Sequence, residues 1–336
     1  MQIEKIDFYG MSAIHFEAGG YEAIMIPEIG ANVVKLSHKA SGTNILRTPA
    51  EDEIETFKGR PQVFGLPLLF PPNRIEDGTY SFENRTYKYP ITIPAQNNYH
   101  HGIIKSQPFI ITRTETGNDY VEIEASYFSN LFNDPIYKHF PHEFICRMIF
   151  RLSAEGLKQT TVFINQSKEN MPIGMGFHTP INVPFTTNGK RNNYKLKLSV
   201  GKRWEMSERS LPIGKLNDLN EEEALLRTEG LYPFGKAIEW ALTNEPLSID
   251  GKNYNGAILT DTEKGISVFY ETDEQFKHWT LWNNGGEVPY VCPEPQSWAT
   301  NAPNLKLPAQ LTGFQFIEPG KEWKAVTRLY VRKTAA

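Results

Sequence analysis

Val121-Glu-Ile-Glu-Ala-Ser-Tyr127 alternates apolar and polar residues, and this pattern decides the expected fold. A β-strand points successive side chains to opposite faces, so a period of two predicts one face on a core and one in solvent. The same alternation recurs in Tyr194–Val200 and, near the end of the chain, in Lys324–Val331. Glu22–Leu36 extends the strand signal toward the N-terminus. Strands therefore dominate the predicted secondary structure.

The segments between these strands favour tight turns, as in Glu318-Pro319-Gly320. Long amphipathic helices are not interleaved with the strands, so an antiparallel arrangement is favoured over a doubly wound sheet. The expected fold is all-β, a large antiparallel β-sandwich with few short helices. We find no internal repeat, linker or charged tail, and we expect one domain over residues 1–336.

Two short helices are predicted. Thr48-Pro49-Ala50-Glu51 offers a Thr N-cap, Pro at the first helical position and Glu at the capping-box position. The acidic run that follows, through Glu55, suits the positive end of a helix dipole. The second predicted helix lies within Glu221–Glu229.

The composition argues against several classes of partner. A net charge of -4 lacks the basic excess that binding to nucleic acid or to an anionic membrane surface requires. The two cysteines, Cys146 and Cys292, are too few for a disulfide framework and favour a reducing cytoplasm. The first residues have no apolar signal-peptide core, and no stretch reaches the roughly 18 apolar residues of a membrane span. We expect a cytoplasmic monomer or homodimer.

Two segments carry candidate catalytic histidines. His100 and His101 are adjacent, and on an extended segment they would point to opposite sides, so one could line a site while the other packs. His178 lies in Pro172–Phe185, among glycines and prolines that constrain the backbone and would fix a catalytic ring. The alternative for His178 is a turn histidine that binds loose backbone groups.

Two further segments carry charged candidates. Glu294 stands between two prolines in Tyr290–Pro303, which set its side chain in one direction. Arg74 offers a rigid fork of donors for sugar hydroxyls or a phosphate. The alternative for Arg74, favoured on the residues alone, is a surface ion pair with Glu76 or Asp77.

Motifs for other chemistries are missing: there is no phosphate-binding glycine loop, no paired-cysteine or HExxH metal motif and no GxSxG elbow. Two histidines and one carboxylate fit proton transfer better than covalent catalysis. We expect neither a metal nor a cofactor.

Together these segments resemble the aldose 1-epimerase (galactose mutarotase) family. Asn73-Arg74-Ile75 and Gly78-Thr-Tyr80 resemble its NRI…G.y signature, and His101-Gly102 resembles its LHG motif. Gly174–Pro180 is similar to its G-x-G-[FY]-H segment, and Val291–Gln296 to its C-x-E-P-[QWY] motif. The matches follow the family order from about residue 22 to residue 320.

The resemblance implies a galactose mutarotase-like supersandwich with a sugar-binding cleft on one sheet. It implies an isomerase that interconverts the α and β anomers of a free hexose by opening and reclosing the ring. Glu294 would be the general base at the C1 hydroxyl, and His178 the general acid at the ring oxygen. His101 would hydrogen-bond the same oxygen or a neighbouring hydroxyl, while Arg74 and Asn73 would bind the sugar.

One family feature is altered. The family carries an Asp that binds sugar hydroxyls, often in an L-D-[DH]-x-F segment. The nearest match here, Ala237–Leu242, puts Glu239 in that place, and Asp250 is the alternative counterpart. The preferred sugar therefore stays open.

Three other functions stay open beside the leading one. A hexose-phosphate mutarotase would need cations at the cleft, for which Arg74 and Lys105 are candidates. The altered Asp segment would suit a non-catalytic carbohydrate-binding protein, and Glu239 with Glu294 could form the carboxylate pair of a glycosidase. Because Cys292 is close to Glu294 in sequence, we also hypothesise that modifying its thiol blocks the cleft.

Overall fold

The structure is a computed structural model, and it describes residues 1–129 and 136–333. Strands dominate these residues, and their α-helices are three short segments, α1 (Ile54–Gly59), α2 (Glu221–Ala224) and α3 (Ala309–Thr312). Neighbouring strands of the large sheets pair antiparallel. The predicted all-β antiparallel sandwich with few short helices is confirmed.

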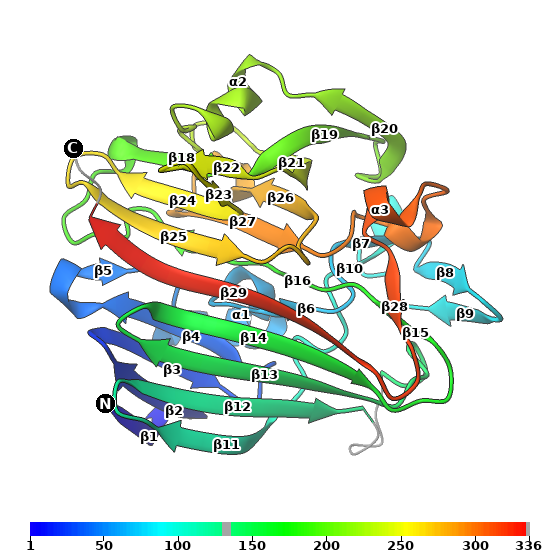
Figure 1. The fold of residues 1–336 in the computed structure, drawn as a ribbon, viewed down its shortest axis with the longest axis horizontal. Coiled ribbons are helices and arrows are strands. Elements are labelled where there is room, and N and C mark those ends of the chain that lie inside the picture. The colour runs from blue at the N-terminus through cyan, green and yellow to red at the C-terminus, as the bar shows by residue number, and fades with distance from the viewer. Residues whose placement is uncertain (130–135, 334–336) are drawn as a thin grey trace.

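One eight-stranded sheet, called here the long-strand sheet, is built mostly from long and regular strands. β12, β13, β14 and β29 run side by side across the fold (Figure 1). In spatial order its strands are β11 (Ile110–Thr116), β12 (Tyr120–Phe128), β13 (Phe144–Ser153), β14 (Gly156–Asn165), β29 (Glu322–Lys333), β25 (Ile266–Thr272), β24 (Gly256–Asp261) and β18 (Tyr194–Leu198).

A second eight-stranded sheet, called here the pocket sheet, has shorter strands. In spatial order they are β20 (Pro212–Asp218), β19 (Val200–Met206), β21 (Glu239–Asn244), β26 (His278–Trp282), β27 (Tyr290–Gln296), β16 (Gly176–Phe177) and β6 (Leu68–Leu69), with β17 (Ile181–Asn182) also on β27.

Smaller sheets complete the fold. The N-terminal sheet is a five-stranded meander of β1 (Gln2–Phe8), β2 (Met11–Ala18), β3 (Tyr21–Ile26), β4 (Asn32–His38) and β5 (Thr43–Asn44). The two-stranded sheets pair β7 (Arg74–Glu76) with β10 (Asn98–His100), β8 (Thr79–Phe82) with β9 (Arg85–Lys88), β15 (Met171–Ile173) with β28 (Gln315–Ile317), and β22 (Leu247–Ile249) with β23 (Lys252–Tyr254).

The core lies between the long-strand sheet and the pocket sheet. Tyr270 of β25 meets Trp279 of β26 with ring centroids 6.5 Å apart. Phe163 of β14 meets Phe70, just beyond β6, at 4.6 Å. Because side chains alternate along a strand, the residues next to Trp279 in β26 point away from this core. That outer face of the pocket sheet is free to carry polar groups.

The predicted strand Tyr194–Val200 is divided between the two sheets. β18 belongs to the long-strand sheet, β19 belongs to the pocket sheet, and Ser199 stands between them. The buried Ser199 hydroxyl accepts a hydrogen bond from Gly256 N at 2.8 Å and donates to Asn244 Oδ1 at 2.7 Å. These bonds satisfy buried polar groups at the point where the chain passes from one sheet to the other. The alternation of side chains in the sequence does not reveal that the strand is divided there.

The first predicted helix begins later than expected. Thr48 is not its N-cap, because a 3₁₀ turn starts at Glu51 and α1 follows at Ile54. The carboxylate that reaches back to the Ala50 amide belongs to Glu53, at 3.1 Å. The second predicted helix forms as α2 and a 3₁₀ turn that ends at Arg227, capped by the Asn220 side chain. Within the described residues, no helix has the length and apolar character needed to cross a membrane.

Candidate active site

Glu294 lies in a row of side chains that crosses the pocket sheet. In the β26–β27 ladder its register partner is Thr280. On the other edge of β27, the pairs Ile181–Val291 and Gly176–Gln296 share one register. Continuing that register between them places His178 opposite Glu294. Thr280, Glu294 and His178 therefore follow one another on the outer face of the sheet.

A gap in the strand pairing lets His178 approach Glu294. β16 ends at Phe177 and β17 begins at Ile181, so no strand of the described residues pairs with this edge of β27 between them. The prolines on either side of Glu294 occupy this stretch, and proline has no N–H to donate to a ladder. The Pro-Glu-Pro sequence thus matches a strand that is unpaired on one edge beside its carboxylate.

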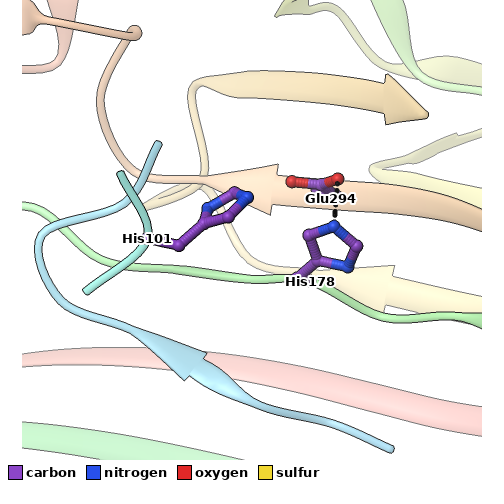
Figure 2. Close-up of side chains that lie close together, drawn as sticks. All are labelled: His101, His178 and Glu294. Atoms are coloured by element: carbon purple, nitrogen blue, oxygen red, sulfur yellow. Dashed lines mark ion pairs between the residues drawn. The ribbon is translucent and has the colours of Figure 1, made fainter. Parts of the chain in front are cut away.

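The His178 imidazole and the Glu294 carboxylate form a buried pair (Figure 2). His178 Nε2 lies 3.2 Å from Glu294 Oε1, and both residues are almost fully buried. Among the described residues, Glu294 Oε2 and His178 Nδ1 have no hydrogen-bond partner. The pair is therefore held in place with unused hydrogen-bonding capacity on both groups.

Burial shifts both members of the pair toward their neutral forms. Desolvation raises the pKa of Glu294 well above its ordinary value, and the charge of Glu239 adds to this effect while Arg74 opposes it. Desolvation lowers the pKa of His178 to about 3. In the free site, burial therefore favours a neutral carboxyl group beside a neutral imidazole.

His101 lies beside the pair, but not as the sequence predicts. β10 ends at His100, and His101 adopts a left-handed backbone with φ 63°. The alternation of side chains is broken there, so the two imidazoles lie against each other, tilted by 30° with centroids 3.3 Å apart, instead of pointing to opposite sides. The His101 ring lies 5.2 Å from that of His178, nearly perpendicular to it. Burial lowers the pKa of both His100 and His101 well below the ordinary value.

Arg74 turns into the pocket rather than toward its sequence neighbours. Its guanidinium lies 2.8 Å from Glu239 Oε1 and donates to Gln96 Oε1 at 3.2 Å. The favoured surface pairing of Arg74 with Glu76 or Asp77 is therefore wrong. Arg209, remote in sequence, binds both of these carboxylates, at 3.0 and 2.7 Å.

The structure places Glu239 at the pocket and Asp250 away from it. Glu239 is the first residue of β21, and its carboxylate reaches Arg74. Asp250 occupies the exposed turn between β22 and β23 with φ 51°. Of the two alternatives for the altered family position, Glu239 is the one positioned to meet a ligand.

These groups surround a cavity on the outer face of the pocket sheet. All six predicted site residues line it, together with six others: Arg60, Gln62, Val63, His100, Thr280 and Trp282. Sequence reasoning missed Thr280 and Trp282, although the alternation in His278–Trp282 carries a signal for them. Trp279 and Leu281 are buried in the core, so Thr280 and Trp282 point to the opposite face.

His101, His178 and Glu294 each offer an atom that could bind a metal ion, and these atoms lie within 4.8 Å of one another. A second group of this kind, His15, Glu17 and Glu22, lies on the N-terminal sheet. Lys105, the other candidate cation for a phosphate group, is outside the lining of the cavity. Its ammonium donates to Gly102 O at 3.0 Å.

Comparisons with known proteins agree on one family. A family model described as Aldose 1-epimerase matches residues 12–330. A galactose mutarotase-like protein from Clostridium acetobutylicum is 37% identical, with 99% of both chains covered and a TM-score of 0.97. A putative aldose 1-epimerase from Escherichia coli K12 (16% identity, 96% of this chain and 100% of that chain covered, TM-score 0.72) shares the fold. So does a galactose 1-epimerase from Lactobacillus acidophilus NCFM (13% identity, 99% of both chains covered, TM-score 0.70).

Proposed function

This chain belongs to the aldose 1-epimerase family, and from that premise we propose that it interconverts the α and β anomers of a free hexose. The observation that carries the proposal is the buried contact between His178 Nε2 and Glu294 Oε1 at 3.2 Å. Mutarotation needs a proton removed from the C1 hydroxyl and a proton supplied to the ring oxygen. A carboxylate and an imidazole that face the same cavity can divide this work.

The active form of the pair is the one with the proton on His178. Moving the proton from Glu294 to His178 is a transfer along their contact and changes no net charge. Sugar hydroxyls that donate to Glu294 favour its ionised form, because hydrogen bonds to a carboxylate lower its pKa. Substrate binding thus prepares the base and the acid together.

Ring opening then proceeds in one balanced step. Glu294 takes the proton from the C1 hydroxyl, the C1–O1 bond becomes a carbonyl, and the bond from C1 to the ring oxygen breaks. The ring oxygen takes the proton of His178. Rotation about the C1–C2 bond presents the other carbonyl face, and the reverse transfers close the ring to the other anomer. Paired proton transfer of this kind contributes roughly 10²–10⁴-fold.

The remaining predicted residues hold the sugar in our proposal. The neutral His101 hydrogen-bonds the ring oxygen or a neighbouring hydroxyl, since its Nδ1 has no partner among the described residues. Arg74 and Glu239 present a charged pair to the sugar hydroxyls, and Asn73 is linked to the same pair through Arg74. Holding the sugar in one orientation adds to the rate enhancement that proton transfer provides.

The test is anomer exchange of α-D-glucose and α-D-galactose, followed by polarimetry or NMR exchange, for the wild type and Glu294→Gln. We expect fast exchange of at least one sugar by the wild type and a loss of about 10²–10⁴-fold in the variant. Full activity in Glu294→Gln would refute the assigned base. Saturable sugar binding without faster exchange would instead indicate a carbohydrate-binding protein.

One observation favours a second candidate, a hexose-phosphate mutarotase. Arg60 lines the cavity and is exposed, and within residues 1–129 and 136–333 its guanidinium has no ion pair or hydrogen bond. An unpaired guanidinium suits a phosphate group. Comparing kcat/KM for glucose and glucose 6-phosphate separates the two functions. A preference for the phosphate that Arg60→Gln abolishes would establish the second.

A further inference from the structure

The Thr280 hydroxyl in the pocket has both of its lone pairs occupied. Asn73 Nδ2 and Gln296 Nε2 each donate to Thr280 Oγ1 at 3.0 Å. A hydroxyl oxygen accepts two hydrogen bonds and donates one. Because both acceptor positions are occupied, the Thr280 hydroxyl can bind a further group only by donating its hydrogen.

The direction of the Asn73 bond follows from its other partner. Arg74 donates to Asn73 Oδ1 at 3.3 Å, and a guanidinium has no acceptor. The oxygen of the Asn73 amide must therefore face Arg74, which leaves its NH₂ group for Thr280. The charged pair of Arg74 and Glu239 thus sets, through Asn73, the orientation of the Thr280 hydroxyl.

The hydroxyl hydrogen of Thr280 has no acceptor within the described part of the chain. Glu294 Oε2, on the register partner of Thr280, has no hydrogen-bond partner there either. Thr280 is buried, with 8% of its surface exposed, and it lines the cavity. A buried donor without an acceptor is costly, so a ligand oxygen in the cavity would relieve that cost.

The row across the sheet indicates which oxygen this is. His178, Glu294 and Thr280 follow one another on three adjacent backbone segments. Along a hexose, the ring oxygen, the C1 hydroxyl and the C2 hydroxyl follow one another in the same sense. With the proposed roles of His178 at the ring oxygen and Glu294 at C1, the third position falls on C2.

We propose that Thr280 donates a hydrogen bond to the C2 oxygen of the sugar and so makes the enzyme select 2-hydroxy aldoses. This inference rests on the proposed mutarotase function. A site built to bond a hydroxyl discriminates against a substrate that lacks it, because the buried donor is then left unpaired.

The experiment compares kcat/KM for a hexose that the wild type converts and for its 2-deoxy analogue, in the wild type and in Thr280→Val. The valine replaces the hydroxyl with a methyl group of similar size. We expect the wild type to disfavour the 2-deoxy sugar by about 10–100-fold more than the variant does. In each protein, kcat/KM for the hexose is divided by kcat/KM for its 2-deoxy analogue. Comparing this ratio between the two proteins cancels the difference in intrinsic reactivity of the two sugars.

Three outcomes are decisive. Equal discrimination against the 2-deoxy sugar in the wild type and Thr280→Val would overturn the assignment. A folded Thr280→Ser variant with the same discrimination as Thr280→Val would also overturn it. A wild type that accelerates no sugar would instead refute the proposed function and leave no ratio to measure. Thr300→Val is the matched control, because Thr300 is a buried threonine outside the lining of the cavity, beside an adjacent pocket that Thr280 also lines.

A second variant tests the orientation of the hydroxyl. In Asn73→Asp, a carboxylate would accept the Thr280 hydrogen and turn it away from the cavity. We expect Asn73→Asp to lose the discrimination at C2 although Thr280 is intact, and adding Thr280→Val should change the ratio no further. Retained discrimination in Asn73→Asp would contradict the proposed network.

Discussion

The two large sheets differ in the kinds of residue that they bury. β13 of the long-strand sheet places Cys146, Met148, Phe150 and Leu152 in the core, and its strand partners follow one unbroken register. β27 of the pocket sheet buries Glu294 and Gln296, and its pairing with β16 and β17 is interrupted. Regular strands supply the apolar core, whereas the interrupted strand admits the groups that do chemistry. The four predictions below test this division of work, from the largest expected effect to the smallest.

Truncating the core of the long-strand sheet should cost stability without altering the site. Phe150 is fully buried, and we expect Phe150→Ala to lower the free energy of unfolding by about 3–5 kcal/mol. The folded protein should keep its kcat/KM within about 2-fold, since no cavity residue is changed. Urea unfolding and anomer exchange on the same sample measure both, with Phe150→Leu as the milder control. A large fall in kcat/KM of folded Phe150→Ala would show that the two sheets do not divide the work.

Acid should destabilise the protein through histidines buried near both sheets. Burial lowers the pKa of His142, just before β13, and of His278, in β26, to about 4. Since the unfolded histidine titrates near 6.5, the unfolded chain binds more protons between these values. The contribution of these two histidines to stability is therefore full above pH 6.5 and falls as the pH drops toward 4. Each histidine contributes a slope of at most about 1.4 kcal/mol per pH unit.

His142→Gln tests this contribution away from the cavity. His142 bonds the Tyr87 hydroxyl at 2.7 Å and Ser167 Oγ at 3.0 Å, and glutamine can keep part of this bonding. Urea midpoints measured from pH 4 to pH 7.5 should fall less steeply toward acid in the variant. An unchanged slope would mean that His142 is not buried in its neutral form.

Removing the buried carboxyl should stabilise the pocket sheet at high pH. Because the pKa of Glu294 is raised, its contribution to wild-type stability is present at low pH and is lost as the pH rises through that pKa. We expect Glu294→Gln to be more stable than the wild type at pH 8, by about 1–3 kcal/mol, with the gap closing toward pH 5. Thermal melts over this range give the difference. A variant that is less stable at pH 8 would contradict the raised pKa.

The smallest effect concerns the cysteines, one in each sheet. Cys146 and Cys292 are fully buried, and burial raises the pKa of both thiols well above the ordinary value. Since the thiolate is the nucleophile, iodoacetamide should modify neither residue in the native protein and both in urea. Mass spectrometry of the labelled chain decides. Selective native labelling of Cys292 would show that the pocket sheet opens locally, and would revive the hypothesis that its modification blocks the cleft.

The sequence predicts the long-strand sheet better than the pocket sheet, for a physical reason. Alternation in Val121–Tyr127 and Lys324–Val331 is a local property, and both segments form strands. The partner of Arg74 is not local, because it is Glu239, which folding brings to the same pocket, while the distant Arg209 pairs with Glu76. The contact between the His100 and His101 rings depends on one left-handed residue, which the two side chains do not encode.

His101, His178, Glu294 and Arg74 stand out from their local sequence alone. Asn73 and Glu239 are found only through family motifs, and the structure adds how all six residues meet. Proline on both sides of Glu294 indicates a constrained carboxylate, but not the gap through which His178 approaches it. Thr280 was missed because a threonine within an apolar strand reads as an ordinary β-branched residue. The alternation in His278–Trp282 indicates only the face on which Thr280 lies, and its two amide donors, remote in sequence or on another strand, appear only in the structure.

The hydrogen bond between Asn73 and Thr280 joins residues 207 positions apart in the chain. Contacts of such long range form late in folding, because the loop they close must be ordered first. The cavity therefore cannot assemble on a nascent chain until β26 and β27 have been synthesised and docked on the earlier segments. Recovery of activity after dilution from urea should consequently lag behind recovery of β-sheet circular dichroism, so that turnover reports the last step of folding.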